Sequence, residues 1–106
     1  MIKIYIDTTD NTKVLVSLTI HGKEYRKEKK MEARSSQLVL PLIEELLAEH
    51  ALTPHDIAEV AVNEGPGSFT GVRVGVSIAN ALAFGLGIPV NGTKIEEGKT
   101  LVEPTY

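Results

Sequence analysis

The chain has 106 residues, of which 42% are hydrophobic and 24% charged, and its formal net charge is -3. A chain of this length forms one domain that buries roughly 60% of the surface of its unfolded form. Its net negative charge argues against a dedicated nucleic-acid-binding protein that works alone. The absence of cysteine excludes disulfides and thiolate chemistry, and it fits a cytoplasmic location.

Targeting and membrane segments are not expected. The apolar stretch MIKIYI at the start of the sequence is too short for the core of a signal peptide. The apolar residues 71–90 are unsuited to a membrane span, because Arg73 and Asn80 would lie in hydrocarbon.

The first third of the chain predicts a three-stranded meander. Residues 2–6 (IKIYI) and 13–20 (KVLVSLTI) have the composition of strands, and His21-Gly22 supplies a turn into a third, charged strand over residues 23–31. Six of the eleven basic residues fall between Lys23 and Arg34, interleaved with glutamates. This pattern indicates a charged edge strand that resists pairing, or a surface that contacts tRNA within a larger assembly.

Two helices and two further strands follow. Ser35-Ser36 offers an N-cap to a helix over residues 38–51, which Pro41 is expected to kink. Pro54 marks the link to a strand over residues 58–64, and a second helix over 70–86 leads to a short strand at 88–90. The order βββαβαβ, with five strands in a mixed sheet, is typical of ribonuclease-H-like and actin-like ATPase domains, and it predicts an α/β fold of that class.

The segment NEGPGSFTG that opens the second helix has two interpretations. The backbone amides of Gly65, Gly67 and Ser68 could form an anion site at the positive end of the helix. A tight turn between strand and helix needs glycine and proline for its own geometry, however. No Walker lysine follows, and Thr70 stands where a dinucleotide motif has its third glycine.

The body of the second helix indicates contact with another protein. Gly71, Gly75, Ala79 and Ala83 recur every four residues, so that one face is nearly bare backbone on which another helix could lie. The other faces are also largely apolar, and one sheet covers only one of them. The alternative is that the first helix packs beside the second and covers the remainder.

These residues resemble a known family. The segment GPGSFTGVRVGVSIANALAFGLGIPV is similar to the signature of the TsaB (YeaZ) family, and IDTTD and SQLVLPLIEELL resemble the same family's amino-terminal lobe. The resemblance covers residues 1–92, and residues 93–106 are expected to form a tail. The second lobe typical of the family is expected to be absent, either because the chain is a minimal member of the family or because it is a piece of a longer one.

The resemblance implies a scaffold without catalytic residues or cofactor that supports tRNA threonylcarbamoyladenosine synthesis. Its expected partners are a TsaD-like catalytic subunit, a TsaE-like ATPase and a second copy of the chain, with tRNA bound only through the complex and no membrane. The family associates through the helices that correspond here to residues 36–50 and 70–86. The interface residues expected from it are Leu38, Leu42, Leu46, Gly71, Val72, Gly75, Ala79, Leu82 and Ala83.

One motif of the sequence departs from the pattern that actin-like ATPase domains have at the same place. The phosphate-binding turn of that fold has the pattern D-x-G-x-T, whereas Asp7-Thr8-Thr9 has threonine in place of the glycine. Asp7 and Thr8, with Gly65, Gly67 and Ser68, are therefore weak candidates for a nucleotide site. The paired metal-binding histidines of TsaD-like proteins have no counterpart in residues 91–106.

Two other sites were considered. His50 and His55 have no standard metal-ligand spacing and are expected at a solvent-facing helix end, so no metal site is predicted. The alternative function is a ribonuclease-H-like nuclease that holds metal ions with Asp7 and Glu64, near Asp10. The first helix supplies Glu44, Glu45 and Glu49 only well along its length, which weakens that alternative.

Overall fold

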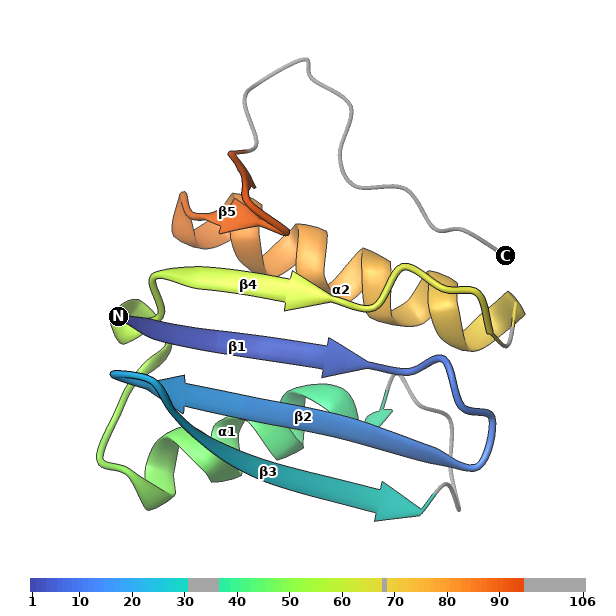
Figure 1. Ribbon diagram of the computed structural model, residues 1–106, viewed down its shortest axis with the longest axis horizontal. Helices are drawn as coiled ribbons and strands as arrows, with labels where there is room; N and C mark the ends of the chain where they lie inside the picture. The colour runs from blue at the N-terminus through green and yellow to red at the C-terminus, as the bar shows by residue number, and fades with distance from the viewer. Residues whose placement is uncertain (31–36, 68, 95–106) are drawn as a thin grey trace.

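The computed structural model describes residues 1–30, 37–67 and 69–94, and these residues form one mixed sheet with two α-helices (Figure 1). The sheet has six strands in the order β3-β2-β1-β4-β5-β6. The strands are β1 (Ile2–Asp7), β2 (Lys13–Ile20), β3 (Lys23–Lys30), β4 (Glu59–Val62), β5 (Pro89–Val90) and β6 (Thr93–Lys94). The helices are α1 (Val39–Glu49), the short 3-10 helix η2 (Pro54–Asp56) and α2 (Phe69–Leu86).

The register of the central strands directs one set of side chains to the core. β1 pairs antiparallel with β2 and parallel with β4, and Ile6 lies opposite both Val16 and Val62. Because successive side chains of a strand point to opposite faces, every second residue of these strands reaches the same side of the sheet. The core side holds the fully buried residues Ile4, Ile6, Val14, Val16, Leu18 and Val60.

Both long helices cover this core side. α1 contacts β2 and β3, whereas α2 contacts β4, β5 and β1, and Figure 1 shows both behind the sheet. Within the described ranges, neither helix lies on the opposite face, where Tyr5, Leu15 and Ala61 are half-buried. The face away from the helices is therefore where the carboxyl end of β1 is accessible.

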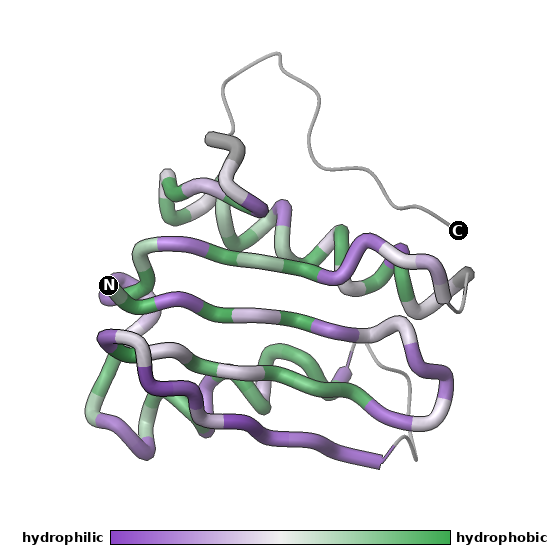
Figure 2. The backbone as a smooth tube through the Cα atoms, in the orientation of Figure 1, coloured by the Kyte–Doolittle hydropathy of each residue, from purple (hydrophilic) through white to green (hydrophobic). Residues whose placement is uncertain are grey.

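β3 is the charged edge strand that the sequence predicts. Figure 2 shows it hydrophilic along nearly its whole length, and it lies at one end of the strand order. Lys27 binds Glu49 at 2.6 Å and Glu45 at 3.5 Å across to α1, and Arg26 binds Glu24 at 2.6 Å. Glutamate partners thus neutralise part of the basic charge of this segment.

Two details of the helices differ from expectation. The expected N-cap Ser35-Ser36 lies outside the described residues, and the residue at the cap position of α1 is Leu38, with no side-chain hydrogen bond. Pro41 falls in the first turn of α1, where backbone N–H groups have no helical acceptor. The missing donor of Pro41 therefore breaks no helical hydrogen bond, and the reasoning that led to a kink does not apply.

The sheet extends beyond the expected fifth strand. Val90 pairs with Thr93 around the two-residue turn Asn91-Gly92, whose φ angles are 47° and 79°. Two positive φ angles are the signature of a type I′ hairpin, for which Asn-Gly is a strongly preferred pair. The prediction from sequence did not include this hairpin, and β6 occupies the two residues that follow residue 92.

Candidate functional site at the carboxyl end of β1

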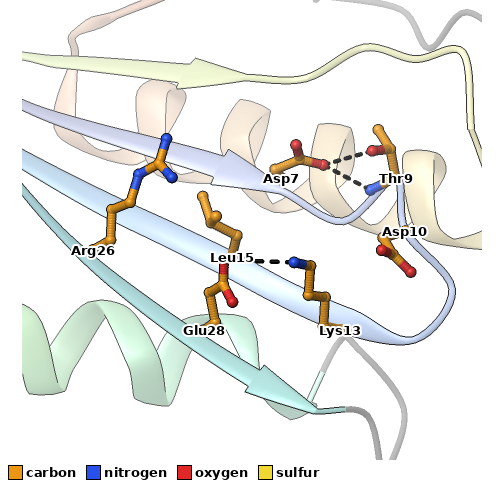
Figure 3. Close-up of a pocket in the computed structure, with 7 residues that line it drawn as sticks. All are labelled: Asp7, Thr9, Asp10, Lys13, Leu15, Arg26 and Glu28. Atoms are coloured by element: carbon orange, nitrogen blue, oxygen red, sulfur yellow. Dashed lines mark hydrogen bonds and ion pairs between the residues drawn. The ribbon is translucent and has the colours of Figure 1, made fainter.

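A hollow of about 320 Å³ opens on the helix-free face, where β1 ends. β1, the β1–β2 turn, β2 and β3 all contribute to it (Figure 3). The lining residues are Asp7, Thr9, Asp10, Lys13, Leu15, Arg26 and Glu28.

Asp7 is the most constrained side chain of this hollow. Its Oδ1 accepts hydrogen bonds from the backbone N–H of Thr9 at 2.9 Å and from the Thr9 hydroxyl at 2.7 Å. Its Oδ2 accepts from Nδ2 of Asn63 at 3.3 Å, at the end of the neighbouring β4. Burial by itself would raise the pKa of Asp7, but the hydrogen bonds from Thr9, Asn63 and Tyr5 outweigh it and hold that pKa below its usual value. Asp7 is thus an ionised carboxylate whose two oxygens are both in use.

The surroundings of Asp7 also shift the pKa of Tyr5. Burial, followed by the negative charge of Asp7 and a hydrogen bond to that carboxylate, raises the pKa of Tyr5 above its usual value. Tyr5 therefore serves as a neutral donor that helps hold Asp7 in place.

The charges around the rest of the hollow are largely balanced. Lys13 forms an ion pair with Glu28 at 3.6 Å (Figure 3), and Arg26 binds Glu24. In the β1–β2 turn, Asp10 accepts hydrogen bonds from the backbone N–H and the hydroxyl of Thr12, which hold its pKa below the usual value. Oppositely charged neighbours reduce the positive potential that a phosphate group would need.

The β4–α2 loop packs directly on the β1–β2 turn. A Cβ placed on Gly67 would lie 2.6 Å from Cβ of Thr9 and 2.8 Å from its carbonyl oxygen, so only glycine fits there. The loop also contains a cis peptide bond between Gly65 and Pro66, and the N–H of Gly65 donates to Oδ1 of Asn63 at 3.1 Å. The turn that the sequence suggested for phosphate is therefore in contact with the chain's own Thr9.

The residues expected at a nucleotide site are Asp7, Thr8, Gly65, Gly67 and Ser68, and the structure describes the first four of them. Asp7 at the end of β1 is linked through Asn63 to the N–H of Gly65, and Thr9 lies against Gly67. Thr8 is only 1% exposed, however, and its hydroxyl donates to the carbonyl oxygen of Gly71. Ser68 lies outside the described residues.

The row of small residues on α2 that was expected to contact a partner helix faces the chain's own sheet. Gly71 and Gly75 are buried, and a Cβ on Gly75 would collide with the Thr8 hydroxyl and lie 3.6 Å from Val62. Ala79 and Ala83 are fully buried in the core. This row therefore packs on the sheet and is not open to a partner helix, because a sheet also needs small residues where a helix approaches it closely.

The remaining expected interface residues are similarly placed. Leu42, Leu46 and Val72 are at most 4% exposed, whereas Leu38 and Leu82 are partly buried at the border of the core. The leucines of α1 therefore bind the helix to its own sheet.

The outer faces of the helices carry a different set of residues. Ser77, Ala81 and Gly85 form a second row with four-residue spacing on α2, and all three are exposed. Phe84 is 64% exposed and Leu40 on α1 is 44% exposed. The sequence analysis missed this face because two interleaved rows of small residues run along α2, and spacing alone does not say which one meets the sheet.

The histidines and carboxylates considered as metal ligands are used in other ways. The ring of His50 lies 4.2 Å from that of Tyr25, with Nδ1 2.9 Å from the carbonyl oxygen of Leu46, while His55 is exposed in η2. Glu64 accepts a hydrogen bond from Asn91. In the part of the chain that the structure describes, no three His, Cys, Asp or Glu side chains come together to hold a metal ion.

Asn91 is the polar residue whose role the sequence analysis missed. Its Oδ1 accepts from the N–H of Val62 at 2.8 Å, and its Nδ2 donates to the carbonyl oxygen of Val62 at 3.0 Å. This side chain therefore occupies the main-chain groups at the end of β4 as a neighbouring strand would. The Asn-Gly pair was the signal that could have located it.

No helix among the described segments is both long and apolar enough to cross a bilayer.

Comparison with known proteins identifies relatives of the chain. Residues 26–97 match the family described as "TsaD: tRNA N6-adenosine threonylcarbamoyltransferase". The tRNA threonylcarbamoyladenosine biosynthesis protein TsaB of Haemophilus influenzae is 40% identical over 75 residues, which are 71% of this chain and 32% of that protein. TsaB of Bacillus subtilis is 38% identical over 61 residues, which are 58% of this chain and 27% of that protein.

A solved structure shares the fold. The protein described as YeaZ from Pseudomonas aeruginosa superposes with a TM-score of 0.78 at 29% identity, over 84% of this chain and 41% of that one. This likeness confirms the predicted ribonuclease-H-like, actin-like ATPase class. The chain spans about a third of the length of the curated TsaB proteins that it matches.

Proposed function

The chain belongs to the TsaB (YeaZ) family, within the broader group that the TsaD family model describes, and we propose that it acts as a non-catalytic partner subunit in tRNA threonylcarbamoyladenosine biosynthesis. In this proposal it works in the cytoplasm and binds a TsaD-like catalytic subunit. A TsaE-like ATPase and a second copy of the chain are further proposed partners, and tRNA is bound only by the assembled complex.

The observation that carries the non-catalytic role is the occupied turn after β1. Thr9 fills the space beneath Gly67, and its two donors bind the carboxylate of Asp7. A phosphate group approaching the backbone at this turn would have to displace the threonine side chain. This arrangement supports a lobe that keeps the architecture of a nucleotide-binding domain without its phosphate site.

The outer faces of α1 and α2 support the binding role. The two helices lie on the same side of the sheet (Figure 1). Among their described side chains, Leu40 on α1 and Phe84 on α2 are large, apolar and exposed. Exposed aromatic side chains often contribute strongly to protein interfaces. The small exposed residues Ser77, Ala81 and Gly85 would let a partner helix approach α2 closely.

Partner binding can be tested with variants of this face. We expect Ala81→Glu and Phe84→Ala to fold normally, because both positions are exposed, and to weaken binding to the TsaD-like subunit at least about tenfold, which is ~1.4 kcal/mol. Asn11→Glu is the matched control, since Asn11 is exposed in the β1–β2 turn, outside both helices. Titration calorimetry would give the affinities, and light scattering would give the composition of the complexes and reveal any homodimer.

The outcomes separate the two parts of the proposal. Unchanged affinity in both folded helix variants would reject the helix face as the interface, while leaving a partner role intact. No binding by the unaltered chain to any TsaD-like subunit would contradict the partner role itself.

A further inference from the structure

The β5–β6 turn contains an asparagine that is chemically reactive in peptides. Of the four asparagines in the sequence, only Asn91 is followed by glycine. Glycine has no side chain to hinder its backbone nitrogen, so an Asn-Gly pair allows that nitrogen to reach the preceding side-chain amide carbon. Asn-Gly pairs are therefore prone to spontaneous loss of ammonia.

The folded chain holds this amide away from such a reaction. Oδ1 and Nδ2 of Asn91 bind the N–H and the carbonyl oxygen of Val62 at 2.8 and 3.0 Å, and Nδ2 also donates to Glu64. The backbone N–H of Asn91 donates to the carbonyl oxygen of Val60 at 2.9 Å. The side-chain amide must leave its partners Val62 and Glu64 before Gly92 can attack it.

We propose that Asn91 is a site of spontaneous deamidation that the contact between the β5–β6 turn and β4 keeps unreactive in the folded protein. In the reaction, the backbone nitrogen of Gly92 forms a bond to Cγ of Asn91 and the bond from Cγ to Nδ2 breaks. Nδ2 leaves as ammonia, with the proton from the Gly92 amide. Water then opens the cyclic imide at either carbonyl group, which yields aspartate or isoaspartate at position 91.

The product cannot restore the original contact. A carboxylate at position 91 has lost the N–H donors that bound Val62 and Glu64, and it brings a negative charge towards both the carbonyl oxygen and the Glu64 carboxylate. Isoaspartate also adds a carbon atom to the backbone of a turn that needs two positive φ angles. Each opening that leads to reaction therefore removes the Nδ2 bonds from the contact between the β5–β6 turn and the end of β4.

The test compares Asn91 in the folded and the unfolded chain. The protein is incubated at mildly alkaline pH in buffer and in denaturing urea, and deamidation at each asparagine is followed by peptide mass spectrometry. We expect Asn91 to react at least about tenfold more slowly in the folded protein, which corresponds to a local opening free energy of ~1.4 kcal/mol. In urea it should react faster than Asn11, which precedes a threonine.

A pair of variants tests the contact with Glu64. Glu64→Ala removes the acceptor for Nδ2 and should raise the folded-state rate at Asn91 several-fold, whereas Glu64→Gln keeps an acceptor oxygen and should stay near the original rate. Equal rates in the folded and unfolded chain, or equal rates for the two folded Glu64 variants, would overturn the proposed protection. An Asn91 rate in urea no higher than that of Asn11 would overturn the site.

Discussion

Replacing Gly75 with alanine tests whether the small-residue row of α2 packs on the sheet. An added Cβ would collide with the hydroxyl of Thr8, which already donates to the carbonyl oxygen of Gly71. The next contacts are ordinary, at 3.5 Å to Cβ of Thr8 and 3.6 Å to Val62. The Thr8 hydroxyl is thus the one close obstacle among these atoms.

The expected cost follows from three effects. Alanine in place of glycine favours a helix by about 1 kcal/mol, but overpacking in a dense core costs about 1–3 kcal/mol. A displaced Thr8 hydroxyl would lose a buried hydrogen bond worth about 1 kcal/mol. We therefore expect Gly75→Ala to lower the free energy of unfolding by about 1–3 kcal/mol, with a fall in Tm of about 4–8 °C for each kcal/mol.

Gly85→Ala is the matched control on the same helix. A Cβ on Gly85 would meet no atom within 4 Å, so only the helix propensity should change, and stability should rise by up to about 1 kcal/mol. Urea denaturation followed by circular dichroism would measure both variants. Equal effects of the two substitutions would refute the packing of this row against the sheet.

A double-mutant cycle identifies the obstacle. Thr8→Ala removes the hydroxyl, so adding Gly75→Ala to that variant should cost less than it does in the original chain. We expect a coupling energy of about 1 kcal/mol or more. Additive effects would mean that the cost comes from contacts other than the Thr8 hydroxyl.

Three further predictions concern the hollow at the end of β1. Because the pKa of Asp7 is lowered on folding, its ionised carboxylate contributes stability above about pH 4, and this contribution is lost as the pH falls through the folded-state pKa. Thr9→Val should raise the pKa of Asp7 and should therefore lower the free energy of unfolding more at pH 7 than in acid. Urea denaturation at both pH values would measure this difference. Asp7→Asn should lower the pKa of Tyr5 in an ultraviolet phenolate titration, since the Asp7 charge helps to raise it, and an unchanged titration would argue against the contact. The chain alone should not hydrolyse ATP, because Thr9 occupies the phosphate turn; turnover above a buffer blank that Asp7→Ala abolishes would contradict this.

The sequence by itself determined the order of the first five strands and the two long helices, and the class of fold. The strand-like composition of residues 2–6 and 13–20 and the helical spacing in 38–51 and 70–86 are local patterns, and they predict strands and helices without reference to long-range contacts. The missing glycine at Thr9 was also readable, because it concerns the identity of one residue in a short motif.

Only the tertiary structure decided which face of α2 is buried. Two rows of small residues run along this helix, and the choice between them depends on the orientation that places Gly75 over Thr8, a residue 67 positions earlier in the chain. The role of Asn91 has the same origin, because its side chain binds Val62, 29 residues away. Periodicity fixes the sides of a helix relative to one another, whereas the side that meets the sheet is set by contacts between segments far apart in the sequence.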